Sequence, residues 1–195
     1  MRKIFSGAAL VLPMTMGMPS NVSAEDVGRT TATVFFGGYA DGKLTSVWRS
    51  AAEEWDRSHV AGLAVEHRFA RFAGKVDLGV EVQALRHWGD QSHGEFTGAL
   101  VARWNPFPWD HIVDTSIAVG EGLSYASRVP ELEIRKHRDS ERLLNYLLVE
   151  AAFAPPGDPG LSFVVRVHHR SGVFGLFNGV KQGSNFLNFG LRWRI

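Results

Sequence analysis

The segment LSFVVRVHHRS, residues 161–171, and the segment SNFLNFGLRWRI, residues 184–195, decide the fold. Both read as strands, because successive side chains of a strand point to opposite faces and apolar residues here occupy alternate positions. In the first segment the apolar face ends in His169 and Ser171, while the opposite face carries His168 and two arginines. An apolar outside and an Arg-rich inside are typical of a transmembrane β-barrel, whose wall faces lipid and whose lumen is polar.

Eight segments tend to alternate in this way and are expected to form strands. They are residues 30–39, 60–70, 75–88, 95–104, 113–122, 143–155, 160–171 and 184–195. Outer-membrane barrels have even strand numbers, short periplasmic turns and longer outer loops. The longer connections are expected to follow the odd segments, at residues 40–59, 89–94, 123–142 and 172–183. We therefore predict an all-β fold, an eight-stranded antiparallel transmembrane β-barrel of the outer-membrane type.

The beginning of the chain has the pattern of a secretory signal. Arg2 and Lys3 precede an apolar stretch at residues 4–18, and small residues follow at the expected cleavage position. The apolar stretch is too short for a transmembrane helix, which needs about 20 residues. We predict a signal peptide over residues 1–24, a single β-barrel domain over residues 25–195, and a location in the outer membrane of a Gram-negative bacterium.

Composition narrows the functional classes. The chain has no cysteine, so it has neither disulfides nor a thiolate metal site, and we expect no cofactor and no metal. With 21 Lys and Arg against 20 Asp and Glu it lacks the basic balance of a nucleic-acid-binding protein. Charged side chains are expected to point inward, pair with one another and fill the lumen, leaving no pore. They are Glu66, Arg68, Asp77, Glu81, Arg103, Glu150, Arg166 and Arg192.

Three side chains at the outer end of the last two strands have the types that acyl transfer needs. A serine nucleophile requires a base to remove its proton, and the base requires a third group that holds its tautomer. Ser171 would be the nucleophile, His169 the base and Asn185 the orienting residue, since Asn185 neighbours both in either plausible strand register. The backbone N–H of Gly172 is the candidate donor to the oxyanion.

The stretches HHRSG, residues 168–172, and GSN, residues 183–185, resemble the lipid A 3-O-deacylase (PagL) family and its relatives labelled acyloxyacyl hydrolase. The resemblance implies an eight-stranded outer-membrane barrel with a His-x-Ser pair on strand seven and an acidic third residue early in strand eight. His169 and Ser171 match the pair, whereas Asn185 stands where the family has Glu. An Asn in this role is similar to outer-membrane phospholipase A, which is a larger barrel.

Residues and resemblance together predict an outer-membrane serine esterase that removes an ester-linked acyl chain from lipid A, within lipopolysaccharide, or from a related outer-leaflet lipid. A phospholipase is one alternative. The other is a non-enzymatic small barrel that serves envelope integrity or surface binding through its long outer loops. Nothing in the sequence indicates an oligomeric state or a nucleic-acid partner.

Three further features have simpler interpretations. His168 is expected to join a hydrogen-bonded network in the lumen. His93 and Glu95 share a face near the outer rim, where we expect polar contacts rather than a metal, since even a catalytic zinc takes three protein ligands. The charge-alternating run at residues 131–139 is interpreted as a solvated loop.

Overall fold

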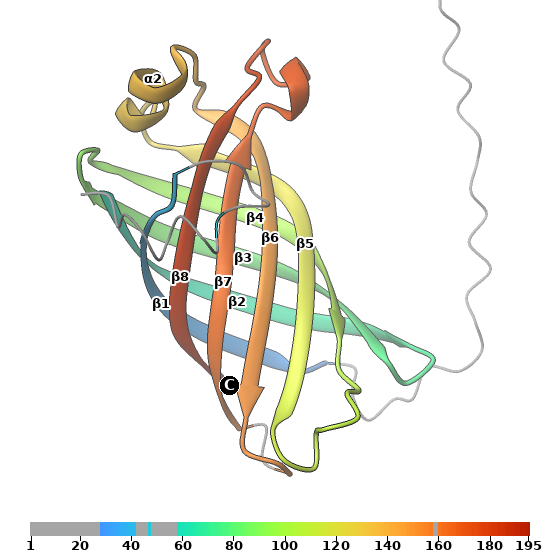
Figure 1. Cartoon of the computed structure of the whole chain (residues 1–195). Coiled ribbons are helices and arrows are strands. Elements are labelled where there is room, and N and C mark those ends of the chain that lie inside the picture. The colour runs from blue at the N-terminus through green and yellow to red at the C-terminus, as the bar shows by residue number, and fades with distance from the viewer. Residues whose placement is uncertain (1–27, 42–46, 48–57, 158–159) are drawn as a thin grey trace, which may run out of the picture.

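The computed structural model describes residues 28–41, 47, 58–157 and 160–195. Eight antiparallel strands form a closed barrel in sequence order, and pairing of the last strand with the first completes it (Figure 1). The strands are β1 (Thr30–Tyr39), β2 (Ser58–Phe72), β3 (Val76–Gly89), β4 (His93–Trp104), β5 (Asp114–Ala126), β6 (Leu143–Ala154), β7 (Leu161–Ser171) and β8 (Gly183–Arg194). The predicted fold class is confirmed. The predicted signal peptide lies outside the described residues.

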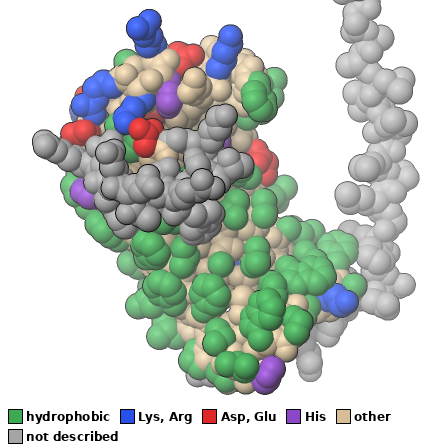
Figure 2. All heavy atoms as spheres, in the orientation of Figure 1, with side chains coloured by type: hydrophobic (Ala, Val, Ile, Leu, Met, Phe, Trp, Pro, Cys, Tyr) green, Lys and Arg blue, Asp and Glu red, His purple; other side chains and the backbone are tan. Residues whose placement is uncertain are grey.

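Alternation along the strands separates an apolar wall from a polar interior. On β3, Val80 and Val82 point outward, whereas Glu81 and Gln83 are buried in the lumen. Figure 2 shows hydrophobic side chains over the barrel wall, with charged side chains gathered mainly over the end that carries a short helix, α2 (Glu131–His137). No helix in the described ranges is long and apolar enough to cross a membrane.

The lumen is filled by paired charges, as predicted. Arg103 donates to Glu66 over 2.7 Å and to Glu150 over 2.8 Å, and Arg166 donates to Glu81 over 2.7 Å and to Glu150 over 2.6 Å. All five side chains are almost fully buried. Buried charges are tolerable only when they are paired and hydrogen-bonded, so this network is what allows these charged side chains to be buried in the lumen.

The run interpreted as a solvated loop is instead helical and plugs the outer mouth of the barrel (Figure 1). Leu132 packs in a buried apolar cluster with Tyr39 and Phe186. Glu133 is 2% exposed and accepts hydrogen bonds from Arg170 and Ser184, each over 2.7 Å. The charge pattern misled the prediction because partners distant in the sequence, on β7 and β8, neutralise and bury Glu133.

One outer connection is also shorter than expected. Strands β3 and β4 pair up to His87 and His93, which leaves only residues 90–92 between the strands. The connections between β1 and β2, between β5 and β6 and between β7 and β8 are long, as predicted. The extra pairing brings His87 into direct cross-strand contact with His93, a juxtaposition that the longer predicted connection did not contain.

Candidate active site

His169 and Asn185 lie opposite each other on β7 and β8. They are register partners, and the Nδ1 of His169 lies 2.7 Å from the Oδ1 of Asn185. An amide oxygen only accepts, so the Nδ1–H of His169 is the donor in this bond. The Nε2 of the neutral imidazole is then the atom that carries a lone pair. The structure therefore brings together two of the three predicted residues with the bond that an orienting residue would make.

Ser171 lies at the outer end of β7, on the same outward face as His169. Its register partners are Asn145 on β6 and Gly183 on β8. Residues two apart on a strand are separated by about 6.6 Å along the chain, a gap that an imidazole ring and a serine side chain span together. Within the described ranges the Ser171 hydroxyl makes no hydrogen bond, so it is bonded neither to His169 nor to any other residue.

The backbone N–H of Gly172, the donor expected from the sequence, already makes a hydrogen bond in the structure. It donates to the carbonyl of Gln182 over 3.2 Å in the loop between β7 and β8. A Cβ at this position would lie 2.0 Å from the Val180 carbonyl oxygen, so glycine is needed for this close approach. The glycine shapes the loop, and its N–H would face an oxyanion only if the bond to Gln182 opened.

The prediction missed Asn145, which lies directly opposite Ser171. Facing strand partners point to the same side of the sheet, with Cβ atoms about 4.5–5.5 Å apart. Asn145 is 9% exposed, and its amide makes no hydrogen bond within the described part of the chain. A signal was available, because alternation places Asn145 among the outward Leu143 and Leu147, where a polar residue is out of place.

A second polar residue on the outward face was missed in the same way. Glu121 of β5 pairs with Leu147 of β6, which in turn pairs with His169. Glu121, Leu147, His169 and Asn185 thus form one row across four strands, a row that register alone determines. Glu121 is exposed on the outward face of the barrel, where a carboxylate needs a polar surrounding.

These residues line one cavity on the outer side of the barrel, with a volume of about 750 Å³. Its wall includes Asn145, His169, Ser171 and Asn185, and its rim includes Phe174 and Lys181 from the loop between β7 and β8. Phe174 belongs to a short 3-10 turn, η3 (Val173–Gly175), and is 95% exposed. A cavity of this size suits a drug-sized group rather than a single water molecule.

The wall beneath the cavity is covered by residues from the connection after β1. Ala40 and Val47 pack against Val167 and Leu187, which are the register partners one step below His169 and Asn185. All four are nearly fully buried. The lower boundary of the site is therefore formed by these packed side chains.

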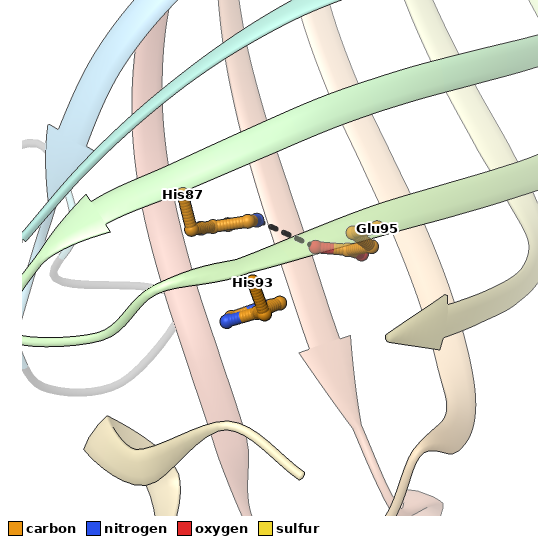
Figure 3. Close-up of side chains that lie close together, drawn as sticks. All are labelled: His87, His93 and Glu95. Atoms are coloured by element: carbon orange, nitrogen blue, oxygen red, sulfur yellow. Dashed lines mark hydrogen bonds and ion pairs between the residues drawn. The ribbon is translucent and has the colours of Figure 1, made fainter. Parts of the chain in front are cut away.

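His168 points into the lumen and joins a polar network, as predicted. Its Nε2 lies 3.0 Å from the Oε1 of Glu95, and the Nε2 of His87 lies 2.7 Å from the Oε2 of the same carboxylate. Figure 3 shows His87 and Glu95 facing each other across the hairpin, with the ring of His93 beside that of His87. The structure thus adds His87 to the pair singled out in the sequence, and the three offer ligand atoms within 4.8 Å of one another.

No protein-family model and no curated protein matches the chain. Solved structures of small outer-membrane barrels do match. Neisserial surface protein A is 12% identical with a TM-score of 0.53, and the match covers 90% of this chain and 99% of that protein. The outer membrane enzyme PagL is 14% identical with a TM-score of 0.53, and the match covers 85% of this chain and 98% of that one. The chain has the fold of Gram-negative outer-membrane barrels, in agreement with the predicted location.

Proposed function

We propose that this protein is an outer-membrane serine esterase that removes an ester-linked acyl chain from lipid A or a related outer-leaflet lipid. The observation that carries the proposal is the bond from His169 to Asn185 beside the uncommitted hydroxyl of Ser171, on the outward face of the barrel. Fold alone does not decide, because the solved barrels that resemble this chain include both an enzyme and a surface protein.

The reaction would begin with attack of the Ser171 Oγ on the ester carbonyl carbon. Because Asn185 holds the proton on Nδ1, the Nε2 of His169 is the atom that takes the Ser171 proton. Collapse of the tetrahedral intermediate breaks the ester bond, and His169 gives the proton to the departing alkoxide. A water molecule, deprotonated by His169, then attacks the acyl-serine, and the fatty acid leaves as Ser171 regains its proton.

The negative charge on the tetrahedral oxygen needs a donor that is in place before the reaction. The side-chain amide of Asn145 meets this requirement, because it faces Ser171 across the strand pair and has no other hydrogen-bond partner in the described ranges. The N–H of Gly172 is already engaged by Gln182. Asn145 is therefore the preferred oxyanion donor, and the geometric requirement is a donor about 2.7–3.1 Å from the oxyanion.

The substrate would reach the site from the outer leaflet. Apart from Glu121 and Asn145, the outward side chains in the outer halves of β5 and β6 are apolar, so an acyl chain lying along the wall would stay in contact with hydrocarbon-like groups. Phe174 and Leu176, 95% and 80% exposed, extend this apolar surface at the cavity rim. Lys181 at the same rim offers a cation for a phosphate of the lipid headgroup.

Phospholipid is a second candidate substrate, and one observation favours it. The orienting residue is a neutral Asn rather than an acid, and the resemblance noted from the sequence connects an Asn-His-Ser triad with a phospholipase. Asn185 makes the orienting bond through its amide oxygen, so the substitution keeps the tautomer while stabilising the imidazolium less than a carboxylate would.

The test is mass spectrometry of lipid A and phospholipids from a Gram-negative host that expresses the parent, Ser171→Ala or Ser92→Ala. Ser92 lies in the turn between β3 and β4, away from the cavity, and serves as the matched control. We expect lipid A that lacks one acyl chain with the parent and the control, and intact lipid A with Ser171→Ala. Lysophospholipid in place of deacylated lipid A would identify the protein as a phospholipase. Unchanged lipids, with the parent shown to be folded, would favour the non-enzymatic barrel.

A further inference from the structure

A cluster of potential metal ligands lies in the lumen, on one hairpin and behind the wall that carries the candidate active site. His87 ends the pairing on β3, His93 begins β4 as its register partner, and Glu95 follows two residues later on the same inward face. Three ligands within nine residues of one hairpin are held together by local chain geometry. Little entropy would be lost in bringing them to one ion.

The burial of His93 has no explanation within the hydrogen-bond network. Its side chain is 3% exposed and stacks on His87 with ring centroids 4.3 Å apart, yet it makes no hydrogen bond in the described ranges. An imidazole that makes no hydrogen bond keeps its unprotonated nitrogen available as a metal ligand. The neighbouring Gln91, 2% exposed, also leaves its Oε1 without a partner.

We propose that His87, His93 and Glu95 bind a divalent transition-metal ion of the zinc type. Two imidazoles and one carboxylate form a ligand set that zinc uses, with metal–ligand distances of about 2.0–2.2 Å. The ligand atoms lie within 4.8 Å of one another, so side-chain shifts of roughly 1.5 Å would close the site around an ion. Figure 3 shows His87 directed at the carboxylate of Glu95, with the ring of His93 lying beside the ring of His87.

The protonation of the His87 ring is compatible with metal binding at this site. His87 now donates from Nε2 to Glu95, while the Nε2 of Gln91 lies 3.3 Å from its Nδ1. Binding a metal at Nε2 would move the ring proton to Nδ1, so the imidazole stays neutral and no proton is lost. Rotation of the Gln91 amide would then let its orphaned Oε1 accept from Nδ1, the outer bond that ligating histidines usually make.

The remaining partners of Glu95 can stay in place. Its Oε1 accepts from His168 and from the Ser124 hydroxyl, and the Ser124 oxygen in turn accepts from Arg170. The metal would replace only the contact between His87 and Oε2. These outer bonds orient the carboxylate and lower the cost of holding a cation beside a buried guanidinium.

The experiment is equilibrium dialysis of the folded, detergent-solubilised barrel against Zn²⁺, with metal analysis. We expect one chelator-removable Zn²⁺ per chain, and at least tenfold weaker binding for His93→Phe, which keeps the ring volume and the stacking but removes the ligand nitrogen. His111→Ala, at an exposed histidine in the turn between β4 and β5, is the control and should bind like the parent.

Thermal unfolding gives an independent readout that separates binding from folding. Without zinc, His93→Phe should unfold at the temperature of the parent, because His93 contributes no hydrogen bond. With zinc, only the parent and the control should gain stability. Equal binding or an equal thermal shift in parent and His93→Phe would overturn the proposal, as would a parent that binds no zinc. If His93→Phe fails to fold, His93→Leu takes its place under the same criteria.

Discussion

Replacing Asn145 with Leu tests the proposed reaction most sharply, because this change removes one hydrogen-bond donor and little else. Asn145 sits on the outward face of β6 between two leucines, so a leucine of similar size matches its surroundings and should not disturb folding. The Asn145 amide faces Ser171 and is uncommitted within the described ranges, whereas the alternative donor at Gly172 is engaged.

The expected loss of kcat follows from the number of donors that could bind the oxyanion. Removing one oxyanion donor costs about 10²–10³ in kcat, equivalent to about 2.7–4 kcal/mol of transition-state stabilisation. With Gly172 held by Gln182, no equivalent N–H is ready to compensate. A donor that acts mainly on the developing charge leaves ground-state binding almost unchanged, so KM should stay within about twofold of the parent.

The assay is the initial rate of fatty-acid release from lipid A in mixed detergent micelles, measured by mass spectrometry across substrate concentrations. Asn145→Gln keeps an amide displaced by one methylene and should recover part of the rate, which a purely structural role would not predict. A kcat for Asn145→Leu within threefold of the parent, with Ser171→Ala inactive, would refute Asn145 as the donor. Activity that persists in Ser171→Ala would refute the esterase itself.

Two further substitutions probe the orienting bond and the helical plug. Asn185→Glu should keep or raise kcat in the same assay, because a carboxylate accepts the same Nδ1–H and better stabilises the imidazolium. Asn185→Leu should lower kcat on the order of 10²-fold or more, because it removes the acceptor. Equal kcat values for Asn185→Leu and the parent would contradict an orienting role. Glu133→Leu should lower the free energy of unfolding by about 3–5 kcal/mol in a urea titration, since Arg170 would stay buried without its carboxylate. The exposed Glu131→Gln on the same helix is the control, and matching stabilities would contradict the plug.

Alternation carried most of the fold prediction. A strand has a side-chain period of two, so apolar and polar positions separate without any knowledge of partners, and eight strands with an Arg-rich interior follow from that. Asn185 could be placed beside His169 for the same reason, because it neighbours the histidine in either plausible register. Features that are determined within a single strand could therefore be predicted from the sequence.

Contacts that depend on the exact register between strands, or on partners distant in the sequence, could not be predicted. That Asn145 faces Ser171 follows from the pairing of β6 with β7, and that His87 faces His93 follows from a turn of only three residues between their strands. The burial of Glu133 depends on Arg170 and Ser184, which lie far along the chain. In each case the deciding contact came from a residue on another strand, which the local pattern does not contain.

The two faces of the end of β7 explain how a lipid-facing site can be held rigidly. His169 and Ser171 point outward, and the residues between and before them point inward, where Arg170 is bonded to Glu133 and His168 to Glu95. The proposed catalytic pair stands at a strand end, where a chain tends to fray, and a reactive geometry would tolerate errors of only about 0.5 Å. Because the backbone of β7 is shared by both faces, the inward bonds limit the motion of the outward pair. The plug and the lumen network therefore support the site that they do not touch.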